Sequence, residues 1–223
     1  MKKVCVFDVN ETLLDLRALD PEFEKIFGAA SVRKEWFGQF IQSALLTIVT
    51  DSYQPFGTIG AAAFDMIAEK YGITVADKDK KALLSKLVQL PPHPEVATNL
   101  ARLKENGHTI AALTNSTLEV AEKQLQNAGI AKYFDKILSA DTIKQLKPAK
   151  AVYEMAATSF DVSVGDIRLI AAHAWDIAGA LNAGCSTAFI SRSGMVLDPL
   201  YQQPEIIGKD LRDVVDQIIE QDA

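Results

Sequence analysis

The sequence predicts an α/β fold with a Rossmann-like parallel sheet core, helices on both faces of the sheet and an inserted helical cap. Short apolar runs bounded by turn residues are typical of buried parallel strands. Helical patterns alternate with these runs, which indicates a parallel sheet covered on both faces. In one long stretch the alternation disappears and only helical periodicity remains, which indicates an insertion.

The core elements follow from these patterns. The expected strands span residues 4–7, 109–113, 136–138, 168–172 and 186–190, and the expected helices span 118–128, 151–160 and 177–183. Gly129 and Gly184 follow two of these helices, and glycine tolerates the left-handed conformation of a helix C-cap. In such a fold the ligand site lies at the carboxyl ends of the strands.

The insertion contains three helical patterns, at residues 32–49, 59–71 and 77–90. It returns to the core through Pro91-Pro92-His93-Pro94, a stiff connector that cannot continue a helix and suits a hinge. We therefore expect a core domain of residues 1–15 and 91–223 and a cap domain of residues 16–90.

The composition excludes several classes of protein. The net charge of −6 argues against a surface for nucleic acid, which requires clustered Lys and Arg. We expect no membrane association, because no apolar run is long enough to span a bilayer. The first residues pass directly into a strand pattern too short for a signal peptide, which favours a cytoplasmic protein. Cys5 and Cys185 lie in or beside apolar strand patterns, so we expect buried thiols and no disulfide. A homodimer is left open.

Polar side chains follow several of the expected strands. Asp8 stands at the carboxyl end of the first strand, where a carboxylate can be a nucleophile or simply cap a turn. Thr114-Asn115-Ser116 ends the second strand and opens a helix, an arrangement that suits either an anion site or helix capping. These side chains should meet at one edge of the sheet.

Two later segments add to this set. Lys147-Pro148 precedes a helix, although an isolated lysine is normally a solvated surface charge. A buried strand then ends in His173-Ala174-Trp175-Asp176, and polar groups packed against an apolar strand end need a partner or a role.

In order, Asp8, Thr114, Lys147 and Asp176 resemble the four motifs of the haloacid dehalogenase superfamily. The sequence is most similar to the type II, L-2-haloacid dehalogenase branch. Two segments carry this similarity: Lys147-Pro148 followed by Val152-Tyr153-Glu154, and Ala174-Trp175-Asp176 after the last motif strand. The resemblance covers nearly the whole chain. It implies an Asp8 nucleophile.

The alternative within the superfamily is a small-molecule phosphatase. Its members carry a second Asp two residues after the nucleophile as general acid, and the residue here is Asn10. They also hold Mg²⁺ with carboxylates near the fourth motif, where this chain has Ala172 and His173. The sequence therefore predicts no metal and no cofactor, and favours a dehalogenase.

For a dehalogenase, the resemblance implies that Asp8 forms an ester intermediate, that Lys147 keeps Asp8 ionised and that Asp176 orients or activates water. The substrate would be a small 2-haloalkanoic acid, a small-molecule carboxylate, which is converted to the 2-hydroxy acid. The expected substrate-binding residues are the backbone amides of Val9 and Asn10, the hydroxyls of Thr12 and Thr114, and the pocket residues Phe37, Asn115, Tyr153, His173 and Trp175. Tyr153 and Trp175 could instead be core aromatics, and His173 a structural residue.

One position departs from the branch. An Arg that follows a Trp on the first cap helix receives the halide in these enzymes, and Phe37 follows Trp36 here. His173, Asn115 or Arg33 would then have to take over the leaving group. Arg33 lies about one helical turn before Phe37, on nearly the same face. A metal-free hydrolase is the first hypothesis, a phosphatase that tolerates Asn10 the second, and a non-catalytic binding protein the third.

Overall fold

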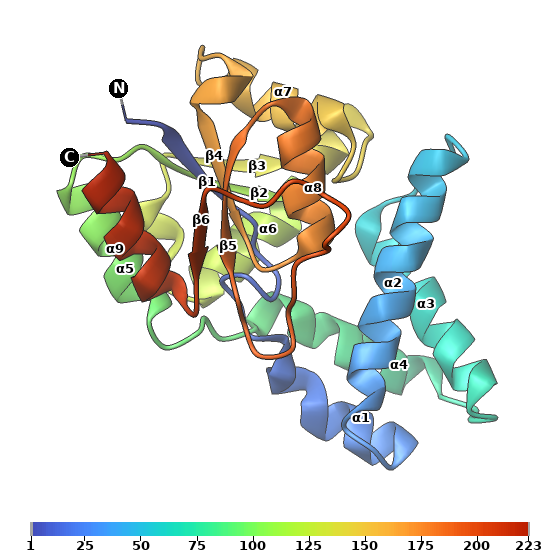
Figure 1. The fold of residues 1–223 in the computed structure, drawn as a ribbon. Helices are drawn as coiled ribbons and strands as arrows, with labels where there is room; N and C mark the ends of the chain where they lie inside the picture. Colours follow the sequence, from blue (N-terminus) through green and yellow to red (C-terminus); the bar gives the residue numbers. More distant parts are fainter. Residues whose placement is uncertain (1, 223) are drawn as a thin grey trace.

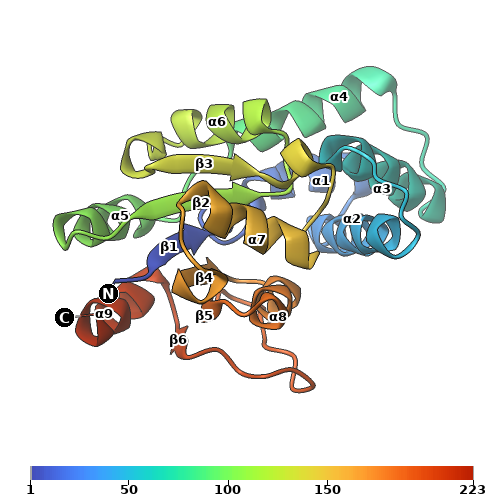
Figure 2. The ribbon, with the colours of Figure 1, turned by 90° about the horizontal axis from the view of Figure 1, so that it is seen from above.

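The computed structural model describes residues 2–222, and its core is a six-stranded parallel sheet. The strand order is β3-β2-β1-β4-β5-β6, with every neighbouring pair parallel (Figure 2). The strands are β1 (Val4–Phe7), β2 (Ile110–Thr114), β3 (Lys136–Ser139), β4 (Ile167–Ala171), β5 (Ser186–Ile190) and β6 (Ile206–Gly208). The predicted parallel α/β core is confirmed. The sequence analysis missed β6.

Helices cover both faces of the sheet. They are α5 (Val96–Glu105), α6 (Leu118–Asn127), α7 (Lys150–Ser159), α8 (Ala174–Ala183) and α9 (Leu211–Gln221). Because side chains alternate along a strand, Cys5 and Phe7 of β1 lie in one hydrophobic cluster with α5 and α9. Val4 and Val6 lie in the other cluster, with α7 and α8. Short 3₁₀ segments at Ala131–Tyr133, Ala140–Ile143 and Val164–Asp166 join these elements.

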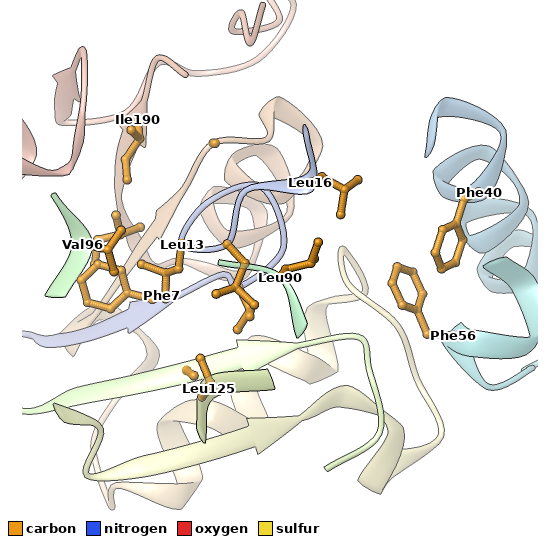
Figure 3. Close-up of a cluster of buried hydrophobic side chains, with 14 of the residues drawn as sticks. Phe7, Leu13, Leu16, Phe40, Phe56, Leu90, Val96, Leu125 and Ile190 are labelled. Atoms are coloured by element: carbon orange, nitrogen blue, oxygen red, sulfur yellow. The ribbon is translucent and has the colours of Figure 1, made fainter. Parts of the chain in front are cut away.

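The segment between β1 and α5 is helical and lies beside the sheet (Figure 1). It comprises a 3₁₀ turn at Leu16–Leu19, α1 (Asp20–Phe27), α2 (Val32–Val49), α3 (Phe56–Lys70), α4 (Asp77–Ser85) and a 3₁₀ turn at Lys86–Gln89. Aromatic rings pack between its helices, and those of Phe40 and Phe56 lie 4.1 Å apart. Figure 3 shows this pair beyond Leu16 and Leu90, in a buried cluster that continues to Phe7 in the sheet.

The two chain segments that join the helical insertion to the sheet lie side by side. The Asp15 N–H donates to the Pro91 carbonyl at 2.8 Å, and the His93 N–H donates to the Leu13 carbonyl at 2.9 Å. An antiparallel bridge joins Leu14 and Pro92 between them. The insertion therefore leaves and rejoins the core at one place, and a hinge there stays a prediction.

Most local features agree with the sequence predictions, and one helix end does not. The helix expected at residues 77–90 ends at Ser85 and is followed by a 3₁₀ turn at Lys86–Gln89. The prediction of α-helix was therefore wrong for residues 86–90. Gly129 and Gly184 have the expected positive φ, at 70° and 99°. Cys5 and Cys185 are free and buried, as predicted. Within residues 2–222, no helix is long and apolar enough to cross a membrane.

Candidate active site

The carboxyl ends of the central strands bring the predicted site residues together. Asp8 follows β1, Thr114 ends β2 and His173 follows β4, so three neighbouring strands of the sheet deliver polar groups to one edge. The Asp8 N–H donates to the Ile170 carbonyl at 3.0 Å, which continues the β1–β4 pairing and fixes the backbone beneath the carboxylate. Asp8 is 5% exposed.

Lys147 lies between two buried carboxylates. Its Nζ donates to Asp8 Oδ1 at 2.8 Å and to Asp176 Oδ2 at 2.5 Å. All three side chains are nearly or completely buried. Lys147, which the family resemblance identified as a catalytic residue, is thus the central cation of the site. Charge-assisted contacts of this length are among the strongest polar interactions in proteins.

These contacts set the ionisation of the three groups. Burial alone would raise the pKa of Asp8, but Lys147 and His173 outweigh it and hold that pKa well below its usual range. Burial opposes charge on Lys147 too, yet the two carboxylates raise its pKa. The pKa of Asp176 is raised, first by burial and then by the Asp8 charge, against the pull of Lys147. At neutral pH, Asp8 is a carboxylate held by an ammonium group.

Two predicted pocket residues support this network from behind. The Tyr153 hydroxyl donates to Asp176 Oδ1 at 2.6 Å. Asn115 binds the backbone of Lys147, accepting from its N–H at 2.7 Å and donating to its carbonyl at 3.3 Å. Both side chains are buried. The contacts of Asn115 and Tyr153 are therefore with the lysine and its acidic partner.

The sequence analysis missed Gly179 on α8, where the Lys147 loop passes close to the helix. A Cβ at this position would lie 2.3 Å from Pro148 Cβ and 2.7 Å from the Tyr153 hydroxyl. Real Cβ atoms do not approach other atoms so closely, so the loop can pack here only over a glycine. A glycine inside an apolar helix pattern was the available signal.

The residues predicted to bind the substrate carboxylate make different contacts from one another. Thr12 donates its hydroxyl to Asp8 Oδ2 at 2.6 Å and accepts from the Ala172 N–H at 2.9 Å, so it orients the carboxylate. Val9 packs its side chain into the hydrophobic core. Asn10 accepts from Gln124 Nε2 at 3.1 Å. At the end of β2, the Thr114 hydroxyl accepts from the Ser116 N–H at 3.2 Å.

His173 connects Asp8 to a second acid, Glu11, which the sequence analysis did not identify. Its Nδ1 lies 3.2 Å from Asp8 Oδ2, and its Nε2 lies 3.1 Å from Glu11 Oε2. Burial opposes the charge on the ring, but these two carboxylates raise the pKa of His173 to about 9. The ring stacks on Trp175 at 5.1 Å between centroids and faces Phe37 at 5.8 Å. His173 is an imidazolium at neutral pH.

A cavity of about 530 Å³ opens above this cluster, between the helical insertion and the core. Its walls include the predicted residues Phe37, His173 and Trp175, together with Glu11 and Arg33. Asp8 lies one contact deeper, through His173. A second cavity, of about 320 Å³, contains Asn10 and shares Leu16 and Phe37 with the first.

Arg33 does lie on the cavity side of α2, as its spacing from Phe37 predicted. Its guanidinium is already paired, with Glu11 Oε1 at 3.5 Å from Nη1 and with the Asp20 carboxylate. A further cation in the cavity wall, Arg192, donates to the Thr12 carbonyl at 2.7 Å and to Glu95 at 2.6 Å. Arg192 follows the end of β5, the kind of position that identified Asp8, so the sequence held a signal for it.

The chain is similar to known proteins over most of its length. The haloacid dehalogenase-like hydrolase family model matches residues 2–184. The chain belongs to this family. The strand-end aspartate and the lysine that binds it are thus found in a haloacid dehalogenase-like hydrolase, and the predicted superfamily is confirmed.

Its relatives cover nearly the whole length of this haloacid dehalogenase-like hydrolase. Haloacetate dehalogenase H-2 of Moraxella sp. (strain B) is 26% identical over 209 residues, 92% of this chain and 93% of the relative. (S)-2-haloacid dehalogenase 1 of Pseudomonas sp. (strain CBS-3) is 29% identical over 192 residues, 85% of each chain. The structure of L-2-haloacid dehalogenase from Xanthobacter autotrophicus, with chloropropionic acid covalently bound, superposes with a TM-score of 0.91 over 98% of both chains at 20% identity.

The donor groups of the site do not fit a divalent cation. Within residues 2–222, no three His, Cys, Asp or Glu side chains converge as metal ligands. The carboxylates of Asp8 and Asp176 both bind the Lys147 ammonium group, which occupies the place between them. A hard cation such as Mg²⁺ wants six oxygen ligands in near-octahedral geometry.

Proposed function

We propose that this protein is a metal-independent hydrolase that converts a small 2-haloalkanoic acid to the 2-hydroxy acid. One observation carries the proposal: the Asp8 carboxylate, kept ionised by Lys147, lies just beneath the cavity. The names of the relatives, haloacetate and (S)-2-haloacid dehalogenases, support the substrate class.

The reaction proceeds in two steps. Asp8 attacks carbon 2 of the acid and displaces the halide, which leaves an ester between the Asp8 carboxyl and the substrate. Water then attacks the carboxyl carbon of Asp8 and releases the hydroxy acid. Lys147 keeps Asp8 ionised for the first step. Asp176, the residue expected to orient or activate the water, acts on Asp8 through Lys147 in the free enzyme.

The substrate carboxylate needs donors above Asp8. We propose that the backbone N–H groups of Val9 and Asn10 and the hydroxyl of Thr114 supply them, because they lie at strand ends beside the nucleophile. Thr12 contributes differently, since its hydroxyl already donates to Asp8. Phe37 and Trp175 line the apolar side of the cavity, which suits the carbon chain of a small acid.

Metal independence follows from the same charges. Lys147 supplies the cation that a nucleophilic carboxylate needs in order to stay ionised, and Asn10 cannot serve as the proton donor that phosphoester cleavage requires. Displacement at carbon has no phosphate charge to neutralise. The site therefore works with its own ammonium group.

We also propose that residues 16–90 act as a cap over a core of residues 1–15 and 91–223, of which Met1 and Ala223 lie outside the described residues. The cavity takes Arg33 and Phe37 from α2 and His173 and Trp175 from the core. Opening of the helical insertion about the paired segments at Asp15 and Pro91 would admit substrate.

A panel of 2-halo acids and phosphate esters, assayed for halide and phosphate release with and without EDTA, tests the proposal. We expect halide release that EDTA leaves unchanged. In a single turnover in ¹⁸O water, the label should enter Asp8 before it enters product. Phosphate release that needs added Mg²⁺ would establish the phosphatase instead, and label found in product with Asp8 unlabelled would show direct attack by water.

A further inference from the structure

Asp8, His173 and Glu11 form a continuous hydrogen-bonded row that opens to the cavity. One ring nitrogen of His173 contacts the proposed nucleophile at 3.2 Å, and the other contacts Glu11 at 3.1 Å. A histidine held by a carboxylate on one nitrogen and facing the reacting group with the other has the arrangement of a catalytic base and its orienting partner. His173 and Glu11 both line the cavity.

This position does not suit a receptor for the departing halide. Displacement at carbon places the leaving group opposite the attacking oxygen, and the carbon itself approaches that oxygen to about 3 to 3.5 Å. A group in contact with the oxygen of Asp8 is therefore on the wrong side of the carbon. His173 instead lies at the carboxyl group on which the second step takes place.

Asp176 is less well placed to take a proton from the attacking water. Its Oδ2 accepts from Lys147 and its Oδ1 from Tyr153, and its side chain is fully buried. Water entering from the cavity meets His173 first, because Asp8 lies behind that ring.

We propose that His173, oriented by Glu11, is the base that deprotonates water during hydrolysis of the ester on Asp8. This inference rests on the proposed function and names the residue that completes its second step. In the free enzyme the same ring is an imidazolium that donates to the Asp8 carboxylate.

The protons balance over the cycle. Formation of the ester removes the negative charge of Asp8, which is one of the two charges that raise the pKa of His173, so the ring loses a proton to solvent through the cavity. The neutral ring then takes a proton from the water that attacks the Asp8 carboxyl carbon. Collapse of the tetrahedral intermediate breaks the bond to the substrate oxygen, and His173 returns the proton to that oxygen. The carboxylic acid left on Asp8 finally transfers its proton to His173, which restores the resting pair.

The charges around His173 permit this cycle. Asp8 and Glu11 contact the ring directly, and Arg33 of α2 binds the far oxygen of Glu11. Lys147 and Asp176 lie behind Asp8, with the Lys147 Nζ 5.8 Å from the centroid of the adjoining Trp175 ring. Glu11 thus keeps its contacts with His173 and Arg33 when Asp8 is esterified, and orients the neutral ring.

The first test separates the two chemical steps in His173→Gln. We expect a single-turnover burst of halide within about threefold of the wild-type rate, a steady-state rate at least about 100-fold lower, and an ester on Asp8 that accumulates and is detected by mass spectrometry of quenched enzyme. Added imidazole should restore turnover to His173→Ala. His108→Gln, at a buried histidine in contact with Cys5 on the sheet, is the matched control and should keep the wild-type ratio of the two rates.

The second test concerns Glu11, a positioning residue. The rate of ester hydrolysis should rise with pH as His173 deprotonates, and Glu11→Gln should move this rise to lower pH, because the lost carboxylate no longer favours the imidazolium. Glu24→Gln, at an exposed residue of α1, should leave the profile in place. A purely structural role for Glu11 would lower the rate without moving the profile.

Two results would overturn the inference while leaving the proposed function intact: a halide burst slowed in parallel with turnover in His173→Gln, or ester hydrolysis at the wild-type rate in that variant. A different result, neither halide nor ester from the wild type on any 2-halo acid, would instead reject the proposed function.

Discussion

Replacing Lys147 with methionine keeps most of the side chain but removes the ammonium group that separates two buried carboxylates. Lys147 contacts Asp8 at 2.8 Å and Asp176 at 2.5 Å, and neither carboxylate is more than 7% exposed. Breaking a buried charge pair by removing one partner typically costs about 3 to 5 kcal/mol, because the other charge is left uncompensated. We expect a loss of that size in the free energy of unfolding at neutral pH.

Loss of Lys147 should also change how the free energy of unfolding depends on pH. In the wild type the pKa of Asp8 is lowered by folding, so its contribution is present above its ordinary pKa of about 3.9 and is lost as the pH falls. Without Lys147, two uncompensated carboxylates are costly to bury, so one of them favours its protonated form and its pKa is raised in the folded state. The variant should then lose stability as the pH rises through that raised pKa.

Urea unfolding at several pH values between about 3 and 8 measures both effects, and halide release measures the loss of the nucleophile. Lys150→Met is the matched control, since Lys150 is exposed and makes only a surface pair with Glu154. Its effect should stay within about 0.5 kcal/mol. Equal stabilities of Lys147→Met and Lys150→Met at pH 7, with no difference in pH dependence, would refute the view that Lys147 compensates buried charge.

Three further predictions concern the rest of the site. Halide release should be unchanged after dialysis against EDTA, and loss with recovery on adding Mg²⁺ would show a metal enzyme. Gly179→Ala should lower the free energy of unfolding by about 1 to 3 kcal/mol and displace the loop at Pro148, with loss of turnover; unchanged unfolding and kinetics would show that the loop adapts. Phe37→Arg should speed the halide burst on 2-chloropropionate about 100-fold, since it places a cation where negative charge develops. An unchanged burst rate would place the halide elsewhere in the cavity.

The order of the motifs could be predicted because parallel strands deliver their ends to one edge of the sheet. Asp8 and His173 each follow an apolar strand run, so their convergence follows from topology alone. The environment of Lys147 could not be predicted in this way. Its loop follows a 3₁₀ turn after β3, and only packing against α8 brings its ammonium group between the two carboxylates.

The features that the sequence analysis missed differ in how strong a local signal they carried. Strand β6 has only three residues, and one of them, Ile207, is exposed at the edge of the sheet. Helix α9 is amphipathic and its N-cap, Asp210, accepts from the Asp213 N–H, a signal the sequence did hold. Glu11 was missed because nothing in the motif spacing shows that a residue with φ of 60° turns its side chain toward His173.

The departures of this chain from its branch are physically connected. Phe37 occupies the position expected for an arginine, and its ring faces His173. His173 binds Glu11, and Glu11 in turn binds Arg33 on the same helix as Phe37. A cation at position 37 would lie close to the imidazolium, so an apolar residue there allows His173 to keep its charge. The halide-binding function proposed for the cap helix and the proton transfer proposed for the core are therefore linked. The effects of substitutions at Phe37 and His173 should depend on each other.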